Sequence, residues 1–175
     1  EPHVFHRYAR RLAGEIRATG ARPVFYLTWA RSHAPENQAA LDAAYRSIAE
    51  EVGGIVAPVG PAWQRARGDP QAPELFHEDG SHPSPAGSYL AACTFYATLT
   101  GVSPLGLPTV VSGPGVDERG EVGALTTLVE MARPAAELLQ RAAWGALTPS
   151  AAAPSLRPGS GGARIALPAP GRGER

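Results

Sequence analysis

The first half of the chain alternates between two kinds of hydrophobic pattern. From Phe5 to Ile16 the larger apolar residues recur every three or four positions, which is typical of an amphipathic helix, and Gly20 ends this pattern. The segment RPVFYLTWA follows, and its apolar residues form a continuous run. Such a run is typical of a strand covered on both faces, so the pattern predicts a buried strand over 24–28.

The same alternation then repeats. Pro35 opens a second helical pattern that continues to Val52 and is stopped by two glycines, and GIVAPVG follows as a short apolar run over 54–58. Helix, strand, helix and strand joined by short connections predict an α/β sheet with parallel strands and right-handed crossovers.

The second half of the chain contains one strongly apolar segment. A short helical piece is predicted over 62–67, and Ser84 and Pro85 have the residue types of an N-cap and a first helical position. The helix that they open is apolar around most of its circumference as far as Gly101, so we expect it to be buried. Between Val122 and Leu147, the spacing of apolar residues predicts a further pair of helices, broken near Pro134.

Length and composition favour one domain with a tail. A chain of 175 residues suits a single domain, and we assign it to residues 1–147. Residues 148–175 are rich in Pro, Gly, Ala and Arg without apolar periodicity, and we expect them to be disordered.

The charge pattern excludes several classes of protein. Sixteen basic residues, all arginine, balance sixteen acidic residues, so nothing resembles the basic surface of a nucleic-acid-binding protein. No apolar stretch approaches the roughly 20 residues of a membrane span. Cys93 is the single cysteine, which rules out a disulfide within the chain. The first residues show no signal-peptide pattern, and the sequence indicates no compartment.

The segment HEDGSHPSPAG places an acid and an imidazole immediately before the apolar helix. Asp79 and His82 are three residues apart, Gly80 permits a tight turn between them, and Pro83 pushes His82 toward an extended conformation. The carboxylate is then able to hold the imidazole Nδ1–H while Nε2 stays free to take a proton. We expect this loop to follow a strand and to lie beyond the carboxyl ends of the sheet. The alternative is structural, with Asp79 capping a turn and His82 satisfying a backbone group.

The extended stretch DGSHPSPAGSYLAA resembles the C-terminal catalytic block of the SGNH/GDSL hydrolases, with the signature D-x-x-H-P-S-x-x-G. PVFYLTWA and GIVAPVGPAW are similar to the last sheet strands of that family. The resemblance implies a flavodoxin-like, three-layer α/β/α fold of which only the C-terminal part is present. It also implies that Asp79 and His82 complete a Ser-His-Asp triad.

The family's other motifs do not occur in this sequence. Gly-Asp is found only in RGDPQ without a following serine, and the only asparagine, Asn37, stands in PENQ. The nucleophile block G-D-S and the G-x-N-D block are therefore missing, and the chain looks like the acid–base portion of a serine esterase or acyl hydrolase. The alternative is a non-catalytic α/β remnant or interaction module.

The remaining expectations concern ligands and partners. The implied substrate is a small-molecule or carbohydrate ester, and Trp29 and Arg31, which follow the first strand, are candidate substrate-binding residues. His77, Asp79 and His82 lack a fourth metal ligand at a regular spacing, so we expect no metal and no cofactor. If the central strands are missing, the strand over 24–28 has an open edge. We then expect the chain alone to self-associate and to lack esterase activity.

Overall fold

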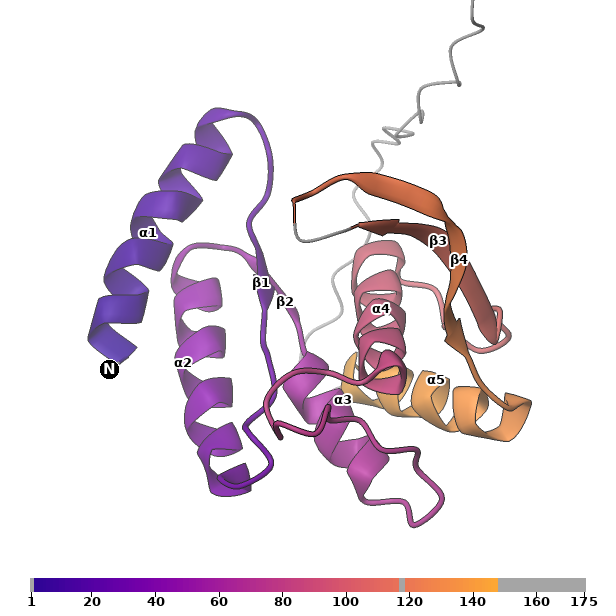
Figure 1. Cartoon of the computed structure of the whole chain (residues 1–175). Coiled ribbons are helices and arrows are strands. Elements are labelled where there is room, and N and C mark those ends of the chain that lie inside the picture. Colours follow the sequence, from indigo (N-terminus) through magenta and orange to yellow (C-terminus); the bar gives the residue numbers. More distant parts are fainter. Residues whose placement is uncertain (1, 117–118, 148–175) are drawn as a thin grey trace, which may run out of the picture.

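The computed structural model describes residues 2–116 and 119–147, which combine helices with two small sheets (Figure 1). The predicted division into a domain over 1–147 and a disordered tail over 148–175 stays a prediction, because the tail lies outside the described residues.

One sheet consists of two parallel strands. β1 (Val24–Tyr26) is followed by the short 3-10 turn η1 (Pro35–Asn37), helix α2 (Gln38–Glu51) and β2 (Ile55–Ala57). The register pairs Val24 with Ile55, Phe25 with Val56 and Tyr26 with Ala57. The two parallel strands predicted from the continuous apolar runs are confirmed, and both are shorter than predicted. The predicted burial of the first strand was wrong, because Val24 and Tyr26 are 39% and 41% exposed.

Helices lie on both sides of this sheet (Figure 1). On one side, α1 (Pro2–Ala18) packs on α2, and Ala9, Ala13, Ile48 and Val52 form a small buried cluster against which Phe25 packs. On the other side, the ring of Tyr26 meets Phe95 edge-on, with 4.9 Å between ring centroids. Phe25 and Tyr26 therefore point to opposite faces of the sheet, as neighbouring strand residues do.

The larger core lies on the second side and joins three helices. These are α3 (Val59–Arg67), α4 (Pro85–Thr100) and α5 (Arg133–Leu147), and the core centres on buried residues such as Trp63, Leu90 and Leu139. The predicted burial of α4 is confirmed only for part of the helix, because Leu90 and Cys93 are buried whereas Tyr96 and Leu99 are exposed. Its predicted start is confirmed as well, because the Ser84 side chain accepts a hydrogen bond from the Gly87 N–H, and Gly101 ends the helix in the left-handed conformation.

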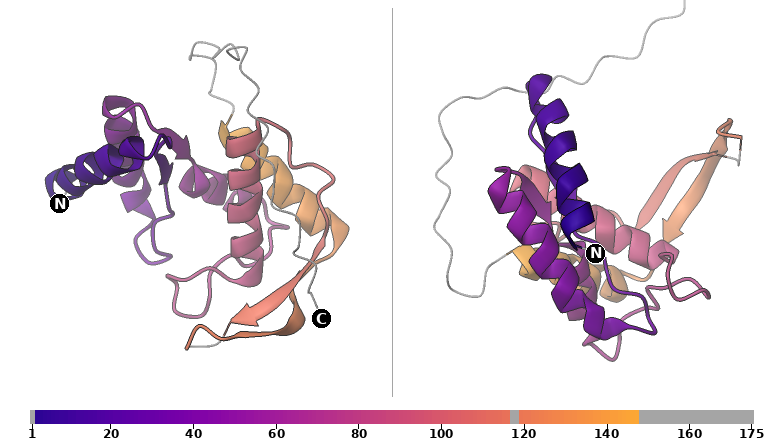
Figure 2. Two further views of the ribbon diagram at one scale, coloured as in Figure 1. Left: turned by 90° about the horizontal axis from the view of Figure 1, so that it is seen from above. Right: turned by 90° about the vertical axis from the view of Figure 1, so that its left-hand side faces the viewer.

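The prediction of a helix after Val122 was wrong. Residues 110–116 and 122–130 form an antiparallel hairpin, β3 (Val110–Val116) and β4 (Val122–Glu130), and only the second predicted helix exists, as α5. Figure 2 shows the hairpin projecting from the helices. Most of β4 is exposed, and Val129 is its one buried residue. Because both faces of the strand meet solvent, its sequence carries no inside–outside alternation that would reveal a strand.

None of the helices in the described ranges is both long and apolar enough to cross a bilayer.

Candidate active site

The candidate site lies in the loop between α3 and α4, not directly after a strand as the sequence predicted, because α3 intervenes between β2 and the loop. Main-chain hydrogen bonds close this loop on itself. The Ser84 N–H donates to the Leu75 carbonyl and the His77 N–H donates to the His82 carbonyl, each at 2.8 Å, and Phe76 and Pro83 form an isolated antiparallel bridge. The loop is therefore a narrow hairpin-like projection whose tip carries residues 78–81.

Asp79 and His82 are hydrogen-bonded at this tip. Asp79 Oδ2 lies 2.5 Å from His82 Nδ1, and Asp79 Oδ1 accepts the main-chain N–H groups of Ser81 and His82 at 2.9 Å each. The carboxylate thus has three partners that all favour its ionised form. The hydrogen bond to His82, followed by the two main-chain N–H groups, holds the pKa of Asp79 far below its usual range.

This geometry sets the state of the imidazole. An ionised Asp79 accepts a hydrogen bond from the ring N–H at Nδ1 of His82. The tautomer with its proton on Nδ1 is therefore favoured, and Nε2 keeps its lone pair. The side chain of His82 is 79% exposed and that of Asp79 is 43% exposed. Within residues 2–116 and 119–147, no hydroxyl is hydrogen-bonded to the His82 ring. The arrangement holds an oriented base, and the described residues supply no nucleophile for it.

Two contacts from the segment after β1 hold the loop in place. The indole N–H of Trp29 donates to the Ser81 carbonyl at 3.0 Å, and the Ser32 N–H donates to the Gly80 carbonyl at 2.9 Å. Gly80 has a φ of +66°, and a Cβ added there would lie 2.2 Å from Ser32 Oγ. Glycine is therefore required at this position both for its backbone conformation and for the close approach of Ser32.

The other residues of the D-x-x-H-P-S-x-x-G motif have structural roles. Ser84 Oγ donates to the Glu74 carbonyl at 2.7 Å and accepts from the Gly87 N–H at 3.1 Å. A Cβ on Gly87 would lie 2.3 Å from the Leu75 carbonyl oxygen and 2.5 Å from the Trp63 ring. Ser84 and Gly87 thus fix the start of α4 against α3 and anchor the end of the loop that precedes the helix.

Trp29 and Arg31 both line a cavity of about 700 Å³ beside α1 and α2. Trp29 is committed to other contacts, because its ring stacks on Trp63 with 4.0 Å between centroids and an interplanar angle of 11°, and its N–H bonds Ser81. Arg31 is exposed. The structure brings Trp29 to the loop of the candidate dyad as a support, and it places Arg31 at the cavity wall.

Sequence reasoning missed Gln38, which positions this segment from the first turn of α2. Its side chain is 2% exposed, accepts from the Ala30 N–H at 2.7 Å and donates to the Thr28 carbonyl at 3.1 Å. Gln38 therefore holds the chain just after β1, where Trp29 begins. No sequence signal marks it, since a glutamine at the start of a helix is ordinarily exposed.

In the described part of the chain, no three His, Cys, Asp or Glu residues are grouped so that they could hold a metal ion.

Comparisons with known proteins give one structural relative. No family model matches the chain, and no curated protein matches it in sequence. The crystal structure of a DUF4886 family protein from Bacteroides uniformis is similar, with a TM-score of 0.54 and 24% identity. The match covers 78% of this chain and 52% of that protein, so the chain spans about half the length of its structural relative. This likeness concerns the fold: a mixed α/β arrangement with helices around a small parallel sheet.

Proposed function

We propose that the chain is the C-terminal part of a serine esterase or acyl hydrolase of the SGNH type, and that it supplies the acid–base half of the catalytic triad. In its complete form the fold is a three-layer α/β/α arrangement. The observation that supports this proposal best is the 2.5 Å contact between Asp79 Oδ2 and His82 Nδ1, with Nε2 left open, inside the D-x-x-H-P-S-x-x-G motif.

The chemistry of the pair follows from its hydrogen bonds. His82 Nε2 takes the proton of a serine hydroxyl as that oxygen attacks the ester carbonyl, and it returns the proton to the departing alcohol. A water molecule then repeats both transfers at the acyl-enzyme. Asp79 stays ionised throughout and stabilises the imidazolium that forms in each step. The hydrogen bonds that lower the pKa of Asp79 keep its side chain a carboxylate at neutral pH.

The proposed substrate is a small-molecule or carbohydrate ester. Arg31 is the better of the two candidate contacts, because its side chain is exposed beside the cavity of about 700 Å³. Trp29 would meet a substrate only through the part of its ring that Trp63 leaves uncovered.

One observation favours a second function, a non-catalytic α/β interaction module. His82 is largely exposed, and no hydroxyl in the described ranges is bonded to it. A chain that had lost its nucleophile block would keep the Asp79–His82 contact as a turn-stabilising pair. The two functions differ in whether any ester cleavage depends on His82.

The test is p-nitrophenyl acetate cleavage by the full-length gene product that contains residues 1–175. His82→Ala should lower kcat/KM by on the order of 100-fold or more, since positioned general bases typically contribute at least that much. His77→Ala is the matched control, because His77 lies in the same loop and bonds through its main chain. Equal activity of the wild type and His82→Ala would refute the esterase proposal and favour the interaction module.

The 175-residue chain on its own should cleave this ester no faster than its His82→Ala variant. An oriented base without a nucleophile and an oxyanion site lacks the groups that provide most of the rate enhancement. Cleavage that depends on His82 in the chain alone would mean that one of its own serines is the nucleophile.

A further inference from the structure

The outer side of α1 carries an apolar stripe that the described structure does not cover. Val4, Tyr8, Leu12 and Ile16 recur every fourth residue and are 37–55% exposed. Amphipathic helices of globular proteins bury such a stripe. Here the smaller residues Ala9 and Ala13 make the buried contact with α2, and the large apolar side chains are left at the surface.

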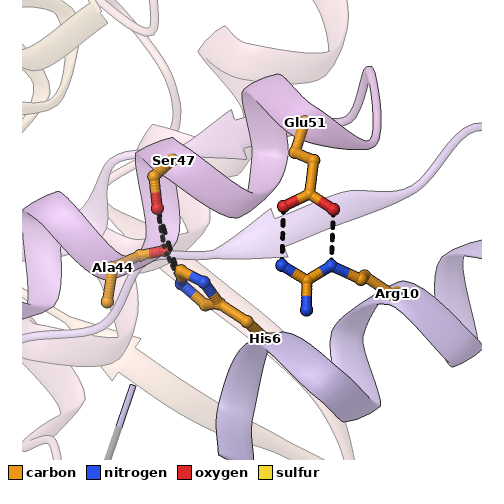
Figure 3. Close-up of polar contacts among 5 residues, drawn as sticks. All are labelled: His6, Arg10, Ala44, Ser47 and Glu51. Atoms are coloured by element: carbon orange, nitrogen blue, oxygen red, sulfur yellow. Dashed lines mark hydrogen bonds and ion pairs between the residues drawn. The ribbon is translucent and has the colours of Figure 1, made fainter. Parts of the chain in front are cut away.

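Two polar contacts fix the direction of this stripe (Figure 3). The guanidinium of Arg10 binds both carboxylate oxygens of Glu51 at 2.5 and 2.8 Å, and His6 Nε2 lies 2.8 Å from the Ala44 carbonyl oxygen. Both contacts tie α1 to α2. They hold the helix so that Tyr8, Leu12 and Ile16 line a groove together with the β1 segment.

The free edge of β1 lies next to this stripe. In the described residues β1 pairs only with β2, so its other edge presents unpaired main-chain groups that are able to bind another strand. Pro23 and Leu27 direct their main-chain groups at β2, so the alternate residues Val24 and Tyr26 direct theirs at the open edge. The two residues are 39% and 41% exposed. The strand edge and the helix stripe together line one groove of about 330 Å³.

The handedness of the chain connections determines where a strand that precedes α1 would lie in the sheet. α1 and α2 lie on the same side of the sheet (Figure 1), and the crossover through α2 leads from β1 to β2. Connections between parallel strands are right-handed in nearly all proteins. A strand that feeds α1 with the same hand must therefore lie on the other side of β1 from β2, at the open edge. The match covers 52% of the structural relative, so about half of that protein lies outside the matched region and leaves room for such a strand.

We propose that the groove between α1 and β1 is the docking site of an apolar, extended segment that precedes α1 in the full-length polypeptide. This segment pairs parallel to β1 through Val24 and Tyr26, and its side chains cover Tyr8, Leu12 and Ile16. A second copy of the chain fits less well, because a two-fold axis at this edge would pair the two β1 strands antiparallel, whereas the existing β1–β2 pair and the topology of α1 call for a parallel neighbour.

The inference does not depend on catalysis, and its test uses amide exchange and mass. The full-length gene product and the 175-residue chain are compared by hydrogen exchange and light scattering. We expect the amides of Val24 and Tyr26 to exchange at least about tenfold more slowly in the longer protein, with a monomeric mass. Exchange that is equally fast in both, or the lack of an apolar extended segment before α1 in the gene product, would overturn the proposal.

A matched pair of substitutions separates the groove from general surface hydrophobicity. Leu12 is 55% exposed in the groove, and Leu125 is 75% exposed on the distant hairpin. In the 175-residue chain, Leu12→Asp should suppress self-association and Leu125→Asp should leave it unchanged. If Leu125→Asp suppresses self-association and Leu12→Asp does not, the interaction surface lies on the hairpin. A stable dimer of the short chain with protected β1 amides would identify the second copy as the occupant and refute a preceding segment.

Discussion

The indole N–H of Trp29 donates a hydrogen bond to the main-chain carbonyl of Ser81, across 52 residues of sequence. Ser81 lies between Asp79 and His82, so this bond fixes the candidate dyad relative to the end of β1. The sequence suggested Trp29 as a substrate contact. The structure gives it a second role, in which the orientation of the acid–base loop depends on an aromatic side chain from another element.

Trp29→Phe should loosen the loop without unfolding the protein. Phenylalanine keeps an aromatic ring over Trp63 but cannot donate to Ser81, and the loss of such a bond costs about 1 kcal/mol. Hydrogen exchange should show faster exchange at Ser81 and His82, and unchanged exchange in α4. Equal exchange rates at these two amides would mean that the indole N–H does not restrain the loop.

Gly80→Ala should destabilise the protein more than Gly20→Ala. Both glycines have positive φ, +66° and +79°, which costs an L-residue roughly 1–2 kcal/mol. Only at Gly80 does the added Cβ meet an atom, Ser32 Oγ at 2.2 Å, whereas nothing lies within 4 Å of it at Gly20. Denaturant unfolding measures the difference. Combining Gly80→Ala with Ser32→Gly should remove the excess, and a strictly additive double variant would contradict the steric explanation.

Ser84→Ala should lower the free energy of unfolding by about 1 kcal/mol, as expected for the loss of an N-cap. The substitution removes the acceptor of the Gly87 N–H and the donor to the Glu74 carbonyl. Ser88→Ala is the control, because Ser88 is an exposed residue in the first turn of the same helix. Thermal or denaturant unfolding should show a clear effect of the first variant and little effect of the second.

Asp79→Asn should make the stability of the protein less sensitive to acid. The pKa of Asp79 is lower in the folded protein than the roughly 3.9 of an unfolded chain, so its stabilising contribution is complete above about pH 4. That contribution is lost as pH falls below this value toward the folded pKa. Unfolding measured from pH 6 to pH 2 should show a shallower acid decline for the variant. Parallel curves for the two proteins would contradict the pairing of Asp79 with His82.

The sequence predicted those elements whose residue types reflect how they pack or how they begin. β1 has apolar residues at successive positions because Phe25 packs on the α1–α2 cluster and Tyr26 meets Phe95 on the other face, although Val24 and Tyr26 remain partly exposed. Ser84 with Pro85 marks a helix start because these residue types suit the first positions of a helix. The hairpin was missed for the opposite reason. Leu125 and Leu128 are exposed on β4, so neither the spacing nor the composition of that segment reports which side of a strand is covered.

The candidate site was predictable only in its local part. Asp79 and His82 are three residues apart, and the intervening Gly80 shows how they meet. Their supports from Trp29, Ser32 and Gln38 come from a distant stretch of chain, and each works through a main-chain carbonyl or N–H group that has no residue-specific signature. Side-chain patterns do not encode contacts to the backbone of another segment.

The contact between Asp79 and His82 and the contact between Trp29 and Ser81 differ greatly in sequence separation, so we expect them to form at different stages of folding. Closing the turn from Asp79 to His82 involves only three residues and is among the fastest events available to a chain, whereas the bond from Trp29 to Ser81 closes a loop of about 50 residues and has to wait for β1 and the core beneath it. During refolding the turn from Asp79 to His82 is therefore expected to close before Trp29 fixes its position relative to β1. A late folding phase, which slows with Trp29→Phe and not with Asp79→Asn, would mark the moment at which the turn becomes part of a site.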